Sequence, residues 1–389
     1  MIDRTRGVTA AAGFTAAGVA AGLKTDGRLD LALVVNDGPR HDAAGVFTSN
    51  RMTAAPVIWS RQAVENGQLA VVVLNSGGAN ACTGPRGLAD AEQMAQWTAQ
   101  AVGVPARDVA VASTGLIGKW LPMPTIEAGI VAASQVLSPT GGTAAAEAIM
   151  TTDTRSKQAA WTAPAGWTVG GMAKGAGMLA PGLATMLVVL TTDAVLDSVD
   201  LSPALWSATS VSFDRADSDG CMSTNDTVLL LASGASGQVP DRAEFAHALT
   251  AVCCDLARQL IADAEGADHE IAITVKGAAS EEDAVEVARS IARSNLFKCA
   301  IAGNDPNWGR ALAAVGTTQA AFDPDQVDLA FNGIVLYQAG APAADRQEVD
   351  LHPRQVDVTV DLHSGLHQAT VWTNDLTHAY VSENADYSS

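Results

Sequence analysis

KGAGMLAPGLATML, residues 174–187, is followed directly by the apolar run VVL at 188–190. A stretch rich in glycine, proline and other small residues therefore leads into Ala184 and Thr185, and an apolar strand is predicted to begin at Met186. By its pattern alone, Thr185 is an ordinary strand residue. Alternatively, the loop exposes the carbonyl of Ala184 to attack by the Thr185 hydroxyl, which cuts the chain. The choice decides whether the fold consists of one polypeptide or two fragments.

The cleavage hypothesis has a chemical rationale. A threonine hydroxyl is a weak nucleophile without an adjacent base, and the neighbouring sequence offers no histidine. Cleavage of the Ala184–Thr185 bond creates an α-amine on Thr185, and the reference pKa of such an amine, about 7.7 to 8.0, lies close to physiological pH. One cut would thus supply both the nucleophile and its base.

The composition limits the class of protein. The chain has 389 residues, 48% of them apolar, which suits one large domain or two closely associated ones. A formal net charge of −19 disfavours nucleic acids and anionic membranes as partners. No window approaches the roughly 20 apolar residues of a membrane span, so a soluble protein is expected. Five cysteines without disulfide or zinc-site spacing favour reduced thiols in the cytoplasm.

The distribution of apolar residues predicts the fold class. Short β-branched runs alternate with alanine-rich helical stretches, which indicates a layered α/β fold. A helix is expected at 88–102, and a second at 241–265 from its helical spacing of apolar residues, ending at Glu265 and Gly266. Strands are expected at 29–35, 70–74, 109–112, 271–275 and 356–362.

Common catalytic motifs are absent from the sequence. No histidine accompanies a nucleophile-elbow pattern, which argues against a serine–histidine–aspartate hydrolase. There is no dinucleotide-binding fingerprint and no phosphate-binding loop with its lysine. The segment that ends at Thr185 is therefore the strongest candidate for chemistry.

That segment resembles the autoprocessing site of the glutamate N-acetyltransferase (ornithine acetyltransferase) family, in which the threonine after alanine becomes the N-terminal nucleophile. The C-terminal tail and seven other segments resemble the same family in the same order, so the resemblance covers essentially the whole chain and favours the catalytic interpretation of Thr185. The seven segments are NSGGANACTG (75–84), STGLIG (113–118), IMTTD (149–153), TVGGMAK (168–174), STNDTVLLL (223–231), DAEG (263–266) and DPNWGR (305–310).

The resemblance implies an α/β sandwich of the N-terminal-nucleophile type, cut into an α fragment of residues 1–184 and a β fragment of residues 185–389 that stay interlocked. It also implies an α2β2 heterotetramer. The implied reaction belongs to the cyclic pathway of arginine biosynthesis: Thr185 accepts the acetyl group of N-acetylornithine and passes it to glutamate in a ping-pong mechanism. No cofactor and no metal are required. Whether acetyl-CoA also serves as a donor stays open.

The resemblance also implies roles for other residues. Thr114 and Gly115 follow a predicted strand, where a turn alone would explain them. The family pattern makes them the oxyanion hole, with the Thr114 hydroxyl and the Gly115 amide facing the developing negative charge. The same pattern assigns substrate binding to Thr151, Lys174, Thr185, Glu265, Asn384 and Ser389.

Simpler explanations compete with three of these roles. Lys174 would by default be a solvated lysine. Its uncharged neighbours favour binding instead, because a substrate carboxylate needs a local cation in so acidic a protein. Thr151 precedes Thr152, and the sequence does not say which of the two faces a pocket. Glu265 stands at an expected helix end, where the helix dipole disfavours a carboxylate; this placement suggests that Glu265 faces a substrate ammonium group.

Simpler explanations also compete for residues in the C-terminal tail and in loops. Asn384 and Ser389 lie in a tail that would normally be frayed, so their match implies a tail folded back over the pocket. Asn75, Asp305 and Arg310 also lie in family-like segments. Hydrogen bonding within loops explains these three equally well, and no catalytic role is assigned to them.

Three alternative functions stay open. An amidohydrolase or aminopeptidase could use the same threonine nucleophile, because hydrolysis differs from transfer only in which acceptor reaches the acyl-enzyme. A member of the family could serve specialised metabolism. A non-catalytic binding protein would keep the fold with an intact Ala184–Thr185 bond.

Overall fold

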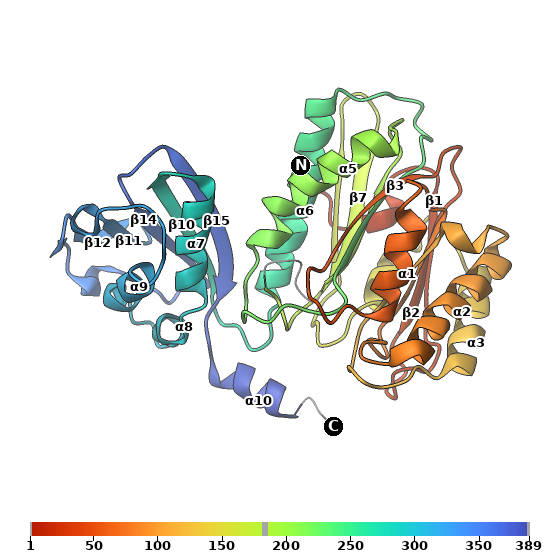
Figure 1. Cartoon of the computed structure of the whole chain (residues 1–389), viewed down its shortest axis with the longest axis horizontal. Coiled ribbons are helices and arrows are strands. Elements are labelled where there is room, and N and C mark those ends of the chain that lie inside the picture. Colours follow the sequence, from red (N-terminus) through yellow and green to blue (C-terminus); the bar gives the residue numbers. More distant parts are fainter. Residues whose placement is uncertain (1, 181–185, 387–389) are drawn as a thin grey trace. The chain divides into compact units, whose positions relative to one another are not determined.

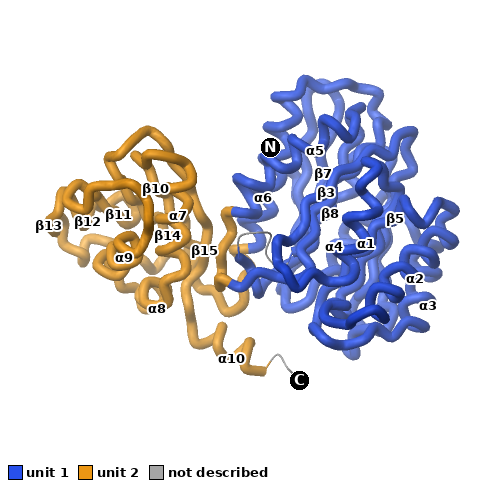
Figure 2. Tube along the Cα trace, viewed as in Figure 1, with its two compact units in different colours: residues 1–214, 221–260 blue, residues 215–220, 261–389 orange. Residues whose placement is uncertain are grey.

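The computed structural model describes residues 2–180 and 186–386 (Figure 1). The chain divides into two compact units, which are coloured separately in Figure 2. Unit 1 consists of residues 1–214 and 221–260, and unit 2 consists of residues 215–220 and 261–389. Each unit has its own β-structure and its own core.

Unit 1 contains two β-sheets. Parallel pairing occurs between β4 and β5 and between β8 and β9, and the other neighbouring strands are antiparallel. One sheet has the order β1-β2-β4-β5, with β1 Phe14–Val19, β2 Leu31–Asn36, β4 Val71–Asn75 and β5 Val109–Ser113. The other has the order β3-β9-β8-β7-β6, with β3 Asp42–Phe47, β6 Lys157–Thr162, β7 Thr168–Lys174, β8 Leu187–Thr192 and β9 Thr227–Ala232.

The layers of unit 1 follow from the alternation of apolar side chains along its strands. In β2, Leu31 and Leu33 pack into a core with α2 and α3, whereas Ala32 and Val34 pack into a second core shared with the five-stranded sheet. Helices α5 and α6 lie on the far side of that second sheet (Figure 1). The helices are α1 Ala55–Val64, α2 Gly84–Val102, α3 Met123–Gln135, α4 Gly142–Ala148, α5 Ser198–Ser210 and α6 Arg242–Ala262. The expected α/β sandwich is confirmed.

Unit 2 is a single sheet with helices packed into one core. Its strand order is β13-β12-β11-β14-β10-β15, and alternate residues of β10 and β14 are buried in that core. The strands are β10 Glu270–Ala278, β11 Asp328–Phe331, β12 Ile334–Gln338, β13 Ala341–Pro342, β14 Gln355–Asp361 and β15 His367–Asn374. The helices are α7 Glu281–Ala292, α8 Asn295–Ala302, α9 Trp308–Val315 and α10 His378–Asp386.

The strands expected from the sequence are confirmed to within three residues at each end, but two helix boundaries were wrong. Helix α2 begins at Gly84 rather than at residue 88. Helix α6 ends at Ala262, and Glu265 lies in the turn that follows it. The guanidinium of Arg354 donates a hydrogen bond of 2.6 Å to the carbonyl oxygen of Ala262 and so satisfies one terminal carbonyl of the helix. Glu265 therefore does not occupy the helix end, and the argument from the helix dipole does not apply to it.

Two further observations concern the helices and the cysteines of the described residues. No helix within them combines the length and the apolar character that a membrane span requires. All five cysteines are free thiols.

Candidate functional site

Three of the predicted site residues meet at one buried lysine in unit 1. Lys174 is the last residue of β7 and is 1% exposed. Its ammonium group donates a hydrogen bond of 2.7 Å to the Thr151 hydroxyl and one of 3.2 Å to the Thr114 hydroxyl. Thr114 follows β5 of the four-stranded sheet, and Thr151 lies in the loop after α4. Residues from two distant segments thus contact the ammonium group of Lys174.

Asp153 organises the surroundings of that lysine. Its carboxylate accepts hydrogen bonds from the Lys157 ammonium (2.5 Å), the Gly175 amide (2.7 Å) and the Thr151 amide (2.9 Å). Burial alone would raise the pKa of Asp153. The charges of Lys174 and Lys157 and the accepted hydrogen bonds outweigh it and hold the pKa well below its usual value. We call Thr114, Thr151, Asp153, Lys157 and Lys174 the Lys174 cluster.

We expect Asp153→Asn to destabilise the folded protein by about 3 kcal/mol at neutral pH, because it leaves buried lysines without their anion. The pKa of Asp153 is lowered by folding from 3.8, so its contribution is complete above about pH 5 and is lost as the pH falls through and below 3.8. Thermal unfolding measured against pH should therefore show a smaller acid-induced loss in the variant.

Asp200→Asn is the matched control, because Asp200 forms a surface ion pair with the exposed Arg242 and such pairs contribute little. If Asp153→Asn has the wild-type unfolding midpoint and pH dependence, the ion pair with Lys157 does not stabilise the site.

The turn after β5 has the geometry of a close backbone approach. The Thr114 amide donates to the Asn75 carbonyl (2.9 Å), and the Gly78 amide donates to the Thr114 carbonyl (3.0 Å). Gly115 has a φ of +128°, and a Cβ atom there would lie 2.7 Å from the Gly78 nitrogen. Only glycine fits this position. Thr114 is 2% exposed, so its hydroxyl lies in a largely dehydrated environment where a hydrogen bond is strong.

The cleavage site itself, Ala184 and Thr185, lies outside the described residues. The strand predicted to follow it is confirmed as β8, and Leu187 pairs with Lys174 across the antiparallel β7–β8 ladder. Cross-strand partners are about 5 Å apart. The lysine of the cluster therefore stands opposite a residue only two positions after Thr185.

A second lysine lies beside Thr151. The Lys24 ammonium donates to the carbonyl oxygens of Leu29 and Met150, both at 2.8 Å. Burial, reinforced by the charges of Arg28 and Lys174, lowers the pKa of Lys24 to about 8. The charges of Lys24 and Lys174 thus act on each other, and Asp26 and Asp30 partly offset them.

Two other predicted residues meet in unit 2. The Asn384 amide of α10 donates a hydrogen bond of 2.9 Å to the Glu265 carboxylate. The turn at Gly266 allows α10 to approach, because φ is +62° and a Cβ atom there would lie 2.2 Å from the Tyr380 nitrogen. Ser389 lies outside the described residues. The tail thus packs against Glu265.

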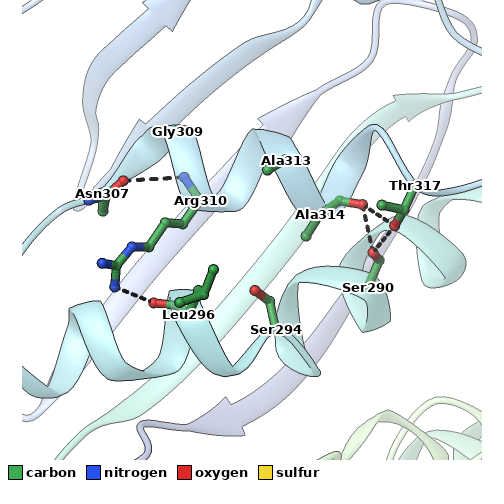
Figure 3. A pocket seen from close by; sticks show the side chains of 9 residues that line it. All are labelled: Ser290, Ser294, Leu296, Asn307, Gly309, Arg310, Ala313, Ala314 and Thr317. Atoms are coloured by element: carbon green, nitrogen blue, oxygen red, sulfur yellow. Dashed lines mark hydrogen bonds between the residues drawn. The ribbon is translucent and has the colours of Figure 1, made fainter.

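The residues without an assigned role make hydrogen bonds within loops. The Asn75 side chain donates to the Gly78 carbonyl, and Asn307 caps α9 by accepting from the Arg310 amide. Asn307 and Arg310 line a pocket of about 460 Å³ (Figure 3). The Arg310 guanidinium donates a hydrogen bond to the Leu296 carbonyl there. Among the described residues, no group of three or more His, Cys, Asp or Glu side chains is placed to hold a metal ion.

Sequence reasoning missed Asp153, Lys157 and Lys24. The sequence does contain a signal for Asp153, because this residue ends the segment IMTTD and is one of few charged residues between positions 128 and 156. Nothing in the pattern around Lys24 or Lys157 indicates burial, since both residues have charged neighbours within a few positions.

Comparison with known proteins places this chain in a family. The ArgJ family profile matches residues 15–389. The arginine biosynthesis bifunctional protein ArgJ of Streptomyces avermitilis is 61% identical over 382 residues, which are 98% of this chain and 100% of that protein. The protein of the same name from Thermobifida fusca is 60% identical over 381 residues, covering 98% and 99% of the two chains.

Two solved structures are also similar. The ornithine acetyltransferase of Mycobacterium tuberculosis complexed with ornithine is 52% identical, with a TM-score of 0.46, and the match covers 48% of this chain and 99% of that chain. For the arginine biosynthesis bifunctional protein of Bacillus halodurans the identity is 37%, the TM-score 0.49 and the coverage 51% and 97%. Because the profile and the full-length relatives match nearly every residue, the chain belongs to the ArgJ family.

Proposed function

We propose that this chain is a glutamate N-acetyltransferase of arginine biosynthesis, which moves the acetyl group of N-acetylornithine to glutamate. The observation that carries the proposal is the buried Lys174, held by Thr114 and Thr151 opposite the strand that follows Thr185. Membership of the ArgJ family supports the same activity. Relatives are named bifunctional, which supports glutamate acetylation by a second donor such as acetyl-CoA.

The active enzyme forms when the Thr185 hydroxyl attacks the carbonyl of Ala184. The cut yields an α fragment, residues 1–184, and a β fragment, residues 185–389, whose first residue carries both a hydroxyl and an α-amine. The amine then serves as the base for its own hydroxyl. The strands on either side of the cut support an interlocked product, because β7 of one fragment and β8 of the other share a ladder of backbone hydrogen bonds.

Acetyl transfer proceeds in two half-reactions. Thr185 attacks the acetyl carbonyl of N-acetylornithine, ornithine leaves, and the amine of glutamate then takes the acetyl group from Thr185. Thr114 and Gly115 stabilise the negative oxygen that develops in each step. No cofactor is needed for this chemistry.

Lys174 binds the carboxylate that the two substrates share. Both N-acetylornithine and glutamate carry an α-carboxylate next to the nitrogen that is acetylated, so one cation can position both. Two threonine hydroxyls already orient the buried ammonium group of Lys174. Binding of the carboxylate therefore costs little conformational entropy. The Glu265 carboxylate, which accepts a hydrogen bond from Asn384, binds the side-chain ammonium group of ornithine.

We further propose that the fragments assemble as an α2β2 heterotetramer and work in the cytoplasm. The five free thiols fit a reducing compartment.

Lys174→Met should mainly raise the Michaelis constants of N-acetylornithine and glutamate alike, by about 10-fold to 150-fold, because a charge-assisted hydrogen bond of about 1.5 to 3 kcal/mol is lost. Steady-state kinetics of both half-reactions measure this. Lys276→Met, at an exposed lysine paired with Asp361, is the control and should keep wild-type constants. Cleavage of the Lys174 variant must be verified first by mass spectrometry. Normal affinity of the cleaved variant for both substrates would exclude Lys174 from binding.

One assay tests the proposed function as a whole. Purified protein is incubated with N-acetylornithine and glutamate, and ornithine, N-acetylglutamate and free acetate are quantified. Equal amounts of ornithine and N-acetylglutamate support transfer. Ornithine with free acetate instead supports a hydrolase, and an uncut, inactive chain supports a binding protein. Transfer to acceptors other than glutamate would support a role in specialised metabolism.

A further inference from the structure

Two loops of unit 1 meet beside Gly115. Strands β4 and β5 are parallel neighbours, so the chain leaves both strands at the same edge of the sheet. We call residues 76–80, after β4, the β4 loop, and residues 114–118, after β5, the β5 turn. The backbone amides of Gly78 and Ala79 donate hydrogen bonds of 3.0 and 3.1 Å to carbonyl oxygens of the β5 turn. The β4 loop therefore fixes the position of the β5 turn.

The direction of the Gly115 amide follows from one of these hydrogen bonds. A peptide unit is planar and trans, so its N–H and C=O bonds point in opposite directions. The Thr114 carbonyl shares a peptide unit with the Gly115 amide, and this carbonyl accepts the hydrogen bond from Gly78. The Gly115 N–H bond therefore points away from the β4 loop. No backbone carbonyl of the described residues accepts a hydrogen bond from it, as suits a donor of the proposed oxyanion hole.

A side chain next to the five-stranded sheet holds both loops. Asn225 stands two residues before the start of β9 and is 4% exposed. Its Nδ2 atom donates a hydrogen bond of 2.6 Å to the Ala79 carbonyl, in the β4 loop. The same atom donates one of 2.8 Å to the carbonyl of Ser113, the last residue of β5. One buried NH2 group thus ties the β4 loop to the residue from which the β5 turn begins.

The other polar groups of Asn225 also have partners. Its Oδ1 atom accepts a hydrogen bond of 2.6 Å from the Thr224 hydroxyl. Its backbone amide donates to the Ser223 hydroxyl (3.1 Å), and its backbone carbonyl accepts from the Thr227 hydroxyl (3.0 Å). Because an amide has one donating and one accepting end, these partners fix the orientation of the side chain. Asn225 is therefore a rigid support for the two loops.

We propose that Asn225 is a positioning residue for the oxyanion hole, which keeps the Gly115 amide and the Thr114 hydroxyl in place by holding the β4 loop and the end of β5. The inference rests on the proposed function, in which Thr114 and Gly115 stabilise the developing oxyanion. Such donors work because they are oriented before the reaction begins. A displacement of about 1 Å can cost about 10²-fold in rate. Asn225 acts through the turn and is assigned no contact with the substrate.

Asn225→Ala removes both hydrogen bonds, and the chain offers a matched control. Asn36 is also buried, and its Nδ2 atom also donates to two carbonyl oxygens, those of Arg40 (2.9 Å) and Ala232 (3.2 Å). Asn36 ends β2, and the residue that begins this strand, Leu31, is the one that pairs with the end of β4. Asn36→Ala therefore loses the same kind of contact at the end of β2 remote from the β4 loop.

Kinetics of the cleaved proteins test the effect on catalysis. We expect Asn225→Ala to lower kcat by about 10-fold to 10²-fold with little change in KM, because the oxyanion hole acts in the transition state. Asn36→Ala should keep both constants. In the Thr114→Ala protein the further loss of kcat from Asn225→Ala should be smaller, since residues that act through one site are not additive. A wild-type kcat in Asn225→Ala, or a raised KM alone, overturns the proposal.

Amide hydrogen exchange, measured by mass spectrometry, tests the positioning without relying on catalysis. In folded Asn225→Ala, peptides that cover the β4 loop and the β5 turn should exchange at least about 10-fold faster than in the wild type, whereas peptides that cover β2 should not change. Unchanged exchange in the two loops overturns the role of Asn225, whether or not the variant is cleaved. Faster exchange in the variant beside a wild-type protein that transfers no acetyl group would instead contradict the proposed function.

A general effect of Asn225 on folding is separated by a second variant. Thermal unfolding first shows whether Asn225→Ala is folded. Asn225→Gln keeps the NH2 group on a side chain that is one methylene longer, so it should retain more of kcat than Asn225→Ala. If neither variant folds although Asn36→Ala does, Asn225 is needed for the fold as a whole and the proposal is overturned.

Discussion

Thr185→Ala is expected to leave a single chain of 39.8 kDa with no measurable acetyl transfer. The substitution removes the hydroxyl that attacks Ala184, and without the cut no α-amine is formed to act as a base. Nucleophile and base are lost together, so the effect should be the largest of any single substitution. Intact mass spectrometry measures the first result, and the release of ornithine from N-acetylornithine measures the second.

Thr185→Ser is the matched variant, because it keeps the hydroxyl and should still yield two fragments. A fragment that begins at residue 185 in the Thr185→Ala protein would contradict self-cleavage. An uncut Thr185→Ala protein that still transfers acetyl groups would contradict the assignment of Thr185 as the nucleophile.

Thr114→Ala is expected to lower turnover by about 10²-fold or more, the typical effect of losing one donor to an oxyanion. Thr114 is 2% exposed and its hydroxyl lies 3.2 Å from the Lys174 ammonium, so water does not replace the hydroxyl easily. The same loss should slow self-cleavage if both reactions pass through one oxyanion hole. Single-turnover kinetics of the fully cleaved protein separate the two effects.

The split between kinetic constants tests the assignment of Thr114. An oxyanion donor acts in the transition state, so its removal should lower kcat with little change in KM. Thr114→Ser retains a hydroxyl and should recover most of the turnover. Normal turnover of the cleaved Thr114→Ala protein would exclude Thr114 from the mechanism, and a raised KM alone would make it a partner of Lys174 in substrate binding.

The sequence predicted the elements because their causes are local. Apolar residues recur every second position in β14 and β10 and nearly every position in the doubly buried β2 and β5, and both patterns are written in neighbouring residues. The strand after Thr185 was predictable for the same reason. Two helix boundaries were misplaced: α2 begins at Gly84 instead of residue 88, and α6 stops at Ala262, where Arg354, 92 positions away, satisfies a terminal carbonyl.

The sequence by itself determined the fold class, the family and the candidate nucleophile, because apolar periodicity and ordered motifs are local properties of the chain. Only the tertiary structure decided that Lys174 is buried, that Thr114 and Thr151 both accept its hydrogen bonds, and that Asp153 anchors this group. These contacts join segments 23 and 60 positions apart, and burial and charge pairing depend on what the folded sheets bring together rather than on any residue's neighbours in sequence.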